Sequence, residues 1–366
     1  MWARAPKIVA LRAESDSLRH LDVIRFAAAV IIVVYHFRNQ WQFAGGGTGQ
    51  LIDAFENLSL GVDIFFVISG IVMSFVYSDR LDYKSFLQKR FARLAPLHYA
   101  TFAAYFLIGV AALAPGAHWS EADRFQPQCI LPHLTFTNSV GFCDVYAFNH
   151  VSWSISAEMV AYLVFPLFLF AVRRSWGWTA LATAAFALGL QIAGPVFGDG
   201  VEWHRLTYSG GFLRAIIGFL IGMLLYAGRD RLALLPRPRL WLLGLTALFF
   251  AGIALGAPRG GLLVVAYCLA AAAYAADLEQ RGSYWLFAAA PLSALTYGIY
   301  MLHPLVRTLF LPGLRWLGLP NNFAVVACGG LVLGAAWLSY QFFERPMRNL
   351  LSPRRVRPEA ALAPSI

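Results

Sequence analysis

Residues 21–38 read LDVIRFAAAVIIVVYHFR, a mostly apolar run that contains Arg25 and His36. About 20 helical residues cross the hydrocarbon core of a bilayer, so we predict a transmembrane helix here. Basic residues precede the run, as they do in a signal peptide. The charges inside the run and the lack of a small-residue cleavage site favour a first helix that is retained.

Similar apolar runs recur along the whole chain. Of its 366 residues, 59% are hydrophobic and only 13% are charged, and this composition excludes an ordinary soluble domain. We predict an all-α, polytopic membrane protein with one membrane domain at 21–344, between tails at 1–20 and 345–366. About ten spans are expected, near 21–38, 61–78, 96–114, 151–172, 177–197, 211–228, 240–256, 260–276, 291–311 and 323–343.

The distribution of Lys and Arg predicts the orientation of the spans. Three of the 29 basic residues lie inside spans, and five lie in one set of alternating loops, which leaves 21 for the other set and the tails. Because basic loops stay in the cytoplasm, both termini are expected there, in a bacterial inner membrane. Anionic lipid headgroups account for the net charge of +10 without a nucleic-acid partner.

Four cysteines are present, and two of them, Cys129 and Cys143, share the longest external loop at about 115–150. An oxidising compartment permits a disulfide between them, but the sequence leaves open whether they are bonded.

Arg25 and His36 form the sharpest pair of candidate site residues. They are eleven residues apart, so a helix places them on one face with a rise of about 16 Å between them. Ionisable side chains inside a span are costly and therefore mark candidate functional sites. The alternatives are a snorkelling anchor for Arg25 and an interfacial histidine for His36.

Histidine suits the deprotonation of a hydroxyl or attack on a thioester, because its pKa lies near 6.5. We therefore predict that His36 is catalytic, with Arg25 as its partner on the same helical face and with Glu158 as the carboxylate that orients the imidazole. The alternative for Glu158 is a structural ion pair with Arg214 or Arg307.

Five further residues are candidates for binding a sugar substrate. Tyr297, Tyr300 and His303 repeat every third residue and share a helical face, although aromatic stripes also pack in cores. Asp63 could bind a sugar hydroxyl or cap its helix. Trp153 is the fifth of these candidates.

Arg90 and Arg93 are three residues apart, just before the third predicted span. Paired guanidinium groups match phosphate oxygens, which suggests a coenzyme site, but positive-inside topology also explains basic residues there. The histidines lack metal-ligand spacing, so no metal site is predicted, and no nucleotide-binding glycine loop is found.

Several segments, in this order, resemble acyltransferase family 3, a family of integral membrane O-acyltransferases that modify surface or exported glycans. They are Leu21 to Arg25 followed by His36, Gly61 to Gly70, Arg90 to Pro96, Trp153 through Glu158 to Pro166, Tyr297 to Pro304, and Phe343 to Pro346.

The resemblance implies a ten-helix domain that takes an acyl group, here expected to be acetyl, from cytoplasmic acetyl-CoA and passes it to an acceptor reached from the other face, here expected to be a glycan. It implies that His36 is the catalytic histidine, that Arg25 is its partner in an Arg-x10-His motif, and that Arg90 and Arg93 serve the coenzyme. Some members carry a hydrolase-like C-terminal domain, whereas this chain ends soon after its last span.

The alternative function is a glycan or lipid transporter that uses the intramembrane charges as a path. Transporters often contain internal repeats, and none is visible in this sequence. The acceptor sugar, its possible lipid carrier, the length of the acyl group, the use of a covalent acyl-enzyme and the oligomeric state stay open.

Overall fold

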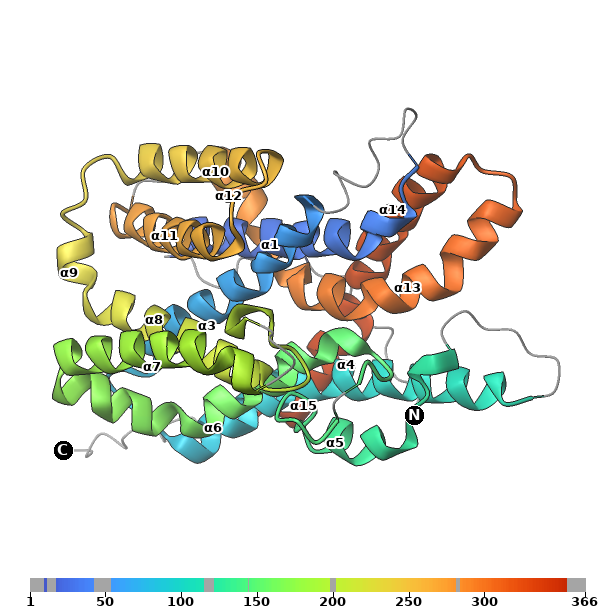
Figure 1. Cartoon of the computed structure of the whole chain (residues 1–366), viewed down its shortest axis with the longest axis horizontal. Coiled ribbons are helices and arrows are strands. Elements are labelled where there is room, and N and C mark those ends of the chain that lie inside the picture. Colours follow the sequence, from blue (N-terminus) through green and yellow to red (C-terminus); the bar gives the residue numbers. More distant parts are fainter. Residues whose placement is uncertain are drawn as a thin grey trace, which may run out of the picture.

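The computed structural model describes residues 10–11, 18–42, 54–114, 122–143, 145–197, 202–280 and 284–353, which form a bundle of helices (Figure 1). The long helices are α1 (Arg19–Phe37), α3 (Gly61–Tyr77), α4 (Tyr83–Ala112), α6 (Trp153–Arg174), α7 (Trp176–Phe197), α8 (Gly211–Ala227), α10 (Pro238–Ala254), α11 (Arg259–Leu278), α13 (Thr296–Trp316) and α14 (Asn321–Ser339).

Each predicted span overlaps one of these helices, and the all-α membrane fold is confirmed. Among the described residues, eight helices are long and apolar enough to cross a membrane. The two remaining helices, α8 and α10, are apolar but have only 17 residues each. At 1.5 Å per residue such a helix is about 25 Å long, slightly shorter than the hydrocarbon core.

Helix α4 begins earlier than the sequence predicted. The side chain of Asp82 accepts a hydrogen bond from the backbone N–H of Ser85 at 3.3 Å and caps the helix. Helix α4 then continues through Pro96 to Ala112. We expected Arg90 and Arg93 just before this helix, but both lie inside it. One rigid helix therefore carries both side chains.

Helices α3 and α8 cross closely because each presents a glycine at the contact. A Cβ atom on Gly70 would come to 2.1 Å from the Phe219 carbonyl oxygen, and one on Gly222 would come to 2.1 Å from the Val67 carbonyl oxygen. Small residues allow such close backbone approach between membrane helices. The crossing brings Asp63 of α3 and Arg214 of α8 within reach of each other.

Helix α1 runs through the centre of the bundle, with α10 and α11 side by side at one end and α13 and α14 at the other (Figure 1). We call the side where α1 begins the tail side. The opposite side, where α1 ends at Phe37 and where residues 122–143 and 145–152 lie, is the loop side.

The two predicted tails fall largely outside the described residues. The C-terminal tail begins with α15 (Arg345–Leu351), which follows a π-helical turn (Tyr340–Glu344) at the end of α14. Helix α15 packs on α4, where Gln88 Nε2 donates a hydrogen bond to the Leu351 carbonyl at 3.1 Å.

A disulfide between Cys129 and Cys143, with an S–S distance of 2.06 Å, closes the loop-side segment that contains α5 (Ile130–Leu134). This answers the question that the sequence left open. His133 lies buried in this segment, and burial lowers its pKa from 6.5 to about 4 although its ring also hydrogen-bonds to the Cys129 carbonyl.

Candidate functional site

Two cavities lie one behind the other in the bundle. The tail-side cavity has a volume of about 130 Å³, and the loop-side cavity has a volume of about 670 Å³. Val62 and Tyr300 line both of them, so the two spaces meet at these residues. All ten sequence-predicted site residues except Asp63 and His303 line one cavity or the other.

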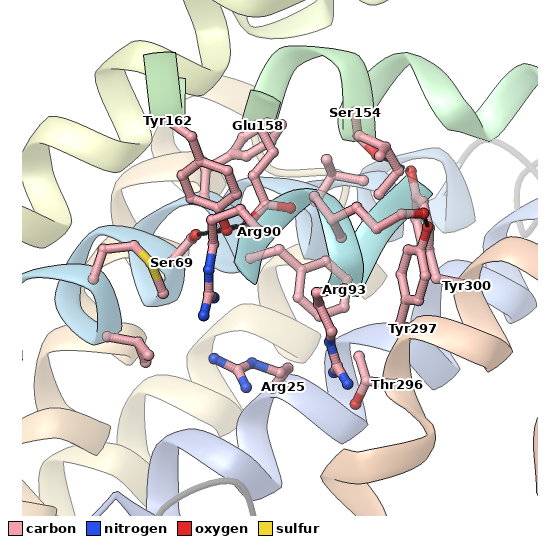
Figure 2. Close-up of a pocket in the computed structure, with 17 residues that line it drawn as sticks. Arg25, Ser69, Arg90, Arg93, Ser154, Glu158, Tyr162, Thr296, Tyr297 and Tyr300 are labelled. Carbon is pink, nitrogen blue, oxygen red and sulfur yellow. Dashed lines mark hydrogen bonds between the residues drawn. The ribbon is translucent and has the colours of Figure 1, made fainter. Parts of the chain in front are cut away.

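Three arginines line the tail-side cavity, and Figure 2 shows that their guanidinium groups reach into the same space. Arg25 comes from α1, and its Nη1 lies 3.6 Å from the Asp22 carboxylate. Arg90 and Arg93 come from α4, and their guanidinium groups lie 6.0 Å from the ring centroids of Tyr162 and Tyr297. The structure thus brings the predicted coenzyme-binding pair together with Arg25.

Glu158 of α6 lines the same cavity. We predicted a contact between Glu158 and His36, and the structure does not form it. Its Oε1 accepts hydrogen bonds from Ser69 Oγ at 2.7 Å and from Tyr162 Oη at 2.5 Å. The predicted carboxylate–imidazole pair is therefore wrong. Glu158 lies about one and a half turns into α6 and lines the same cavity as the three arginines. The alternative ion pair of Glu158 with Arg214 or Arg307 is not formed either.

His36 instead pairs with His303. The Nδ1 atom of His36 lies 3.0 Å from His303 Nε2 and 3.0 Å from the Ile32 carbonyl oxygen. The Nδ1 atom of His303 lies 3.2 Å from the Ile299 carbonyl oxygen. The sequence had placed His303 only in a sugar-binding stripe, because a contact across 267 residues has no local signal.

These contacts assign the tautomers of both rings. A carbonyl oxygen can only accept, so His303 carries its proton on Nδ1 and presents a lone pair on Nε2. His36 Nδ1 must then be the donor, to Ile32 and to His303. A neutral His36 consequently has its free lone pair on Nε2, and His36 lines the loop-side cavity.

Two further side chains contact His36, and the sequence assigned neither of them to it, since Arg307 was expected only as an alternative partner of Glu158. His150 approaches with its ring edge, at 5.1 Å between ring centroids. Arg307 Nη1 donates a hydrogen bond to the backbone carbonyl of His36 at 3.0 Å. His150 precedes the Trp153–Glu158 segment by only a few residues, which is the one sequence signal that could have pointed to it. Within the described ranges, no three His, Cys, Asp or Glu side chains are placed to hold a metal ion.

Asp63 is fully buried and forms a two-point ion pair with Arg214. Arg214 Nε and Nη2 donate to its two carboxylate oxygens at 2.7 and 2.5 Å. Its carboxylate therefore has its charge satisfied inside the protein and does not face a substrate, so the predicted sugar contact is corrected. A buried charge requires such a partner, and Arg214 supplies it across the close α3–α8 crossing.

Tyr297 and Tyr300 of the predicted stripe line the cavities, whereas His303 lines neither. Tyr297 lines the tail-side cavity and donates a hydrogen bond to the Leu94 carbonyl at 2.5 Å. Tyr300 stands at the junction, 2.7 Å from Ser154 Oγ. Trp153 lines the loop-side cavity, with the Arg214 guanidinium 5.4 Å from its ring. Of these three, Tyr300 is placed between the arginines and His36.

Tyr146 also lines the loop-side cavity, outside the spans. Burial and the neighbouring Tyr35 and Tyr208 raise its pKa. The phenol therefore stays protonated at neutral pH and can donate a hydrogen bond into the cavity.

Comparison with known proteins gives three informative relatives. Acyltransferase MdmB of Streptomyces mycarofaciens is 32% identical over 46% of this chain and 44% of its own length. Peptidoglycan O-acetyltransferase OatA of Listeria monocytogenes is 26% identical over 90% of this chain and 55% of its own. Exopolysaccharide production protein ExoZ of Rhizobium meliloti is 28% identical over 81% of this chain and 91% of its own.

The chain spans about half the length of MdmB and OatA. No solved structure matches it. The sequence model of one family, described as an acyltransferase domain, matches residues 18–341, which is nearly the whole chain. This extent of agreement, over all the helices that build the two cavities, shows that the chain belongs to acyltransferase family 3.

Proposed function

We propose that this protein is a membrane O-acetyltransferase that moves an acetyl group from acetyl-CoA in the tail-side cavity to a glycan hydroxyl in the loop-side cavity. The family and the names of two relatives, a peptidoglycan O-acetyltransferase and an exopolysaccharide production protein, support the reaction type and a glycan acceptor. The proposal covers both a free glycan and a glycan linked to a lipid carrier.

The three guanidinium groups of the tail-side cavity support a coenzyme site. Arg25, Arg90 and Arg93 converge from two helices, and guanidinium groups bind phosphate oxygens with charge-assisted hydrogen bonds (Figure 2). Arg25 and His36 lie on one helix with a rise of about 16 Å between them. A coenzyme held by its phosphates at Arg25 can therefore extend its pantetheine arm past Val62 and Tyr300 toward His36.

The tautomer of His36 carries the proposal for the chemistry. His36 Nε2 takes the proton of the acceptor hydroxyl while that oxygen attacks the thioester carbonyl carbon. The C–S bond then breaks, and the CoA sulfur leaves with the proton from the His36 imidazolium. His303 and the Ile32 carbonyl keep the Nδ1 proton in place throughout. His303 thus takes the orienting role that we had predicted for Glu158.

The charge asymmetry and the disulfide together support one orientation. Basic residues cluster in the tails and the tail-side loops, whereas the Cys129–Cys143 disulfide lies on the loop side. Disulfides persist in oxidising compartments, and basic loops remain in the cytoplasm. We place both tails and the coenzyme in the cytoplasm, the membrane domain at 21–344 in the bacterial inner membrane, and the acceptor on the outer side.

The test is acetyl transfer by purified protein in detergent or in vesicles, with labelled acetyl-CoA and glycan fragments. Release of CoA that depends on both the glycan and His36 is the expected result. Movement of unmodified glycan across vesicles without CoA release would instead support the alternative, a transporter.

A further inference from the structure

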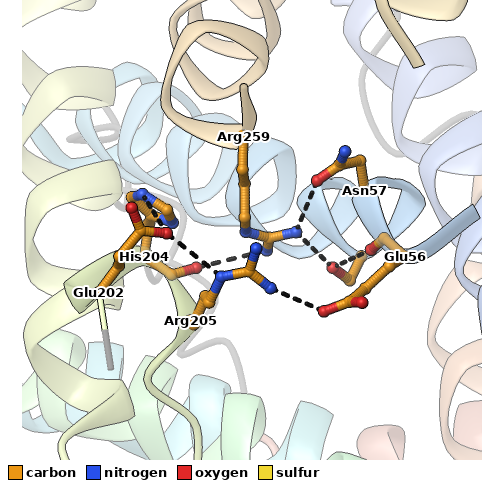
Figure 3. Close-up of polar contacts among 7 residues, drawn as sticks. Glu56, Asn57, Glu202, His204, Arg205 and Arg259 are labelled. Atoms are coloured by element: carbon orange, nitrogen blue, oxygen red, sulfur yellow. Dashed lines mark hydrogen bonds and ion pairs between the residues drawn. The ribbon is translucent and has the colours of Figure 1, made fainter. Parts of the chain in front are cut away.

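One wall of the loop-side cavity contains a buried arginine whose contacts are all uncharged. Arg259 begins α11, and its guanidinium reaches between residues 56–59 and 202–205 (Figure 3). Nη1 donates to Ser59 Oγ at 2.9 Å and to Asn57 Oδ1 at 3.4 Å, and Nη2 donates to the His204 carbonyl at 3.3 Å. The Nε atom is buried and has no hydrogen-bond partner.

Two other arginines of this cavity differ from Arg259 because each holds a carboxylate. Arg214 grips Asp63 through the edge formed by Nε and Nη2. Arg205 lies 2.7 Å from Glu56 and 3.2 Å from Glu202 (Figure 3). In Arg259 the corresponding Nε–Nη2 edge makes one bond to a carbonyl and leaves Nε unused.

Arg259 is only 7% exposed, and a buried guanidinium that no carboxylate contacts through a hydrogen bond is costly. Its position at the start of α11, where no side chain caps the helix, adds the positive end of the helix dipole to the same place. The cavity as a whole is rich in arginine. The charged residues that line it are Arg38, Arg124, Arg205, Arg214, Arg259, Glu56 and Asp123.

We propose that the acceptor of the proposed transfer reaction is anionic, and that a carboxylate or phosphate group on it binds at Arg259. The anion would bind the Nε–Nη2 edge of Arg259 at two points, as the Asp63 carboxylate binds the same edge of Arg214. Arg259 and His36 line the same cavity, so an acceptor anchored at Arg259 can present a hydroxyl to His36. The acceptor class is therefore an acidic sugar unit or a phosphate-bearing glycan, and the inference rests on the proposed function.

Binding separates this inference from the reaction itself. Isothermal titration of the purified full chain would compare an oligogalacturonide, the neutral galacto-oligosaccharide of equal length, and galactose 1-phosphate. We expect one or both anionic probes to bind and the neutral one to bind at least tenfold more weakly. The oligogalacturonide tests a carboxylate, and the sugar phosphate tests a phosphate. Equal affinity for the neutral probe, or binding of none of the three, overturns the proposal.

Variants assign the effect to Arg259. Arg259→Gln is expected to weaken the anionic probe about 10- to 100-fold, the loss of a charge-assisted contact. Arg259→Lys keeps the positive charge but loses the two-point geometry of the guanidinium group. Its affinity for the anionic probe should lie between those of Arg259→Gln and the wild type. Arg205→Gln is the matched control, since it removes the same charge from the same cavity at a residue already held by carboxylates.

An unchanged affinity in Arg259→Gln, measured at an unchanged melting temperature, overturns the assignment. An equal loss in Arg205→Gln also overturns it, because the cavity would then attract anions only through its total charge. If the anionic probe binds through Arg259 but no acetyl transfer occurs, the proposed reaction fails and the binding site stands.

Discussion

The protein contains two histidine pairs that differ in burial and in what their rings face: His98 and His133 are both buried, whereas His36 is only half-buried. His36 and His303 join ring to ring at 3.0 Å, and His36 lines the loop-side cavity. His98 and His133 join ring to backbone: His98 Nε2 donates to the His133 carbonyl at 2.8 Å, and their rings are parallel, with centroids 6.4 Å apart. Neither His98 nor His133 lines either of the two cavities.

Pairing between histidines therefore does not by itself identify the proposed general base, because only His36 of the four lines a cavity. Phe136 packs on His98 at 4.5 Å between ring centroids, and both histidines of this pair are buried. In the first pair, the second histidine supplies an acceptor for Nδ1 and leaves Nε2 of His36 toward a cavity. We therefore expect the first pair to determine turnover and the second to determine stability.

The largest expected effect is that of His36→Ala. Loss of a general base lowers rates by about 10²- to 10⁴-fold, and we expect this loss in kcat while the protein stays folded and inserted. The measurement is acetyl transfer by the purified variant, with its melting temperature as the control for folding. Near-normal turnover by a well-folded variant would show that His36 is not the general base. The two histidine pairs would then not differ in function as we expect.

Next in size is the effect of the arginines, which should change binding and not turnover. Arg90→Ala or Arg93→Ala removes a phosphate partner and should raise KM for acetyl-CoA about ten- to a hundredfold, with kcat restored at saturation. Lys89→Ala is the matched control, because Lys89 is exposed beside Arg90 and lines neither cavity. If saturating acetyl-CoA fails to restore turnover, the coenzyme phosphates bind elsewhere.

A smaller loss is expected for His303→Ala. Removal of one neutral hydrogen bond to His36 Nδ1 costs about 0.5–1.5 kcal/mol, which is at most about tenfold in kcat. His303→Gln retains a side-chain acceptor and should recover part of this loss, and the pH profile of kcat should shift only in His303→Ala. Identical profiles in all three proteins would mean that His303 only fills space.

His98→Ala should leave kcat unchanged and lower stability. It deletes the donor to the buried His133 carbonyl, and an unsatisfied buried acceptor costs about 1–3 kcal/mol. Thermal unfolding in detergent measures the loss, with His36→Ala as the comparison. A fall in kcat without a fall in melting temperature would contradict the division of roles between the pairs.

The smallest effect concerns pH and His133. Its folded pKa of about 4 lies below the value of 6.5 expected when unfolded, so only the unfolded chain gains a proton as pH falls between these values. The contribution of His133 to the free energy of unfolding is therefore fully present above pH 6.5 and is lost as the pH falls toward 4. His133→Phe, which retains packing on Phe102 and Phe148, should show a shallower fall of melting temperature from pH 7 to 4.5. An equally steep fall would show that other groups govern the acid sensitivity.

The sequence alone determined the elements of the fold and part of the site. A span must satisfy its backbone hydrogen bonds within itself, so its length and apolar character are local properties that the sequence displays directly. The shared face of Arg25 and His36 follows from helical periodicity in the same way. The early start of α4 was missed because charged residues conceal a helix from a search for apolar runs.

Only the tertiary structure decided which polar side chains meet. His303 pairs with His36 across 267 residues, Asp63 with Arg214 across 151, and Glu158 with Ser69 across 89. Each pairing depends on how two helices cross, as Gly70 and Gly222 allow for α3 and α8. An imidazole, a guanidinium or a carboxylate accepts several partners equally well in chemical terms, so its partner is determined by the packing of the helices and not by the residues around it in the chain.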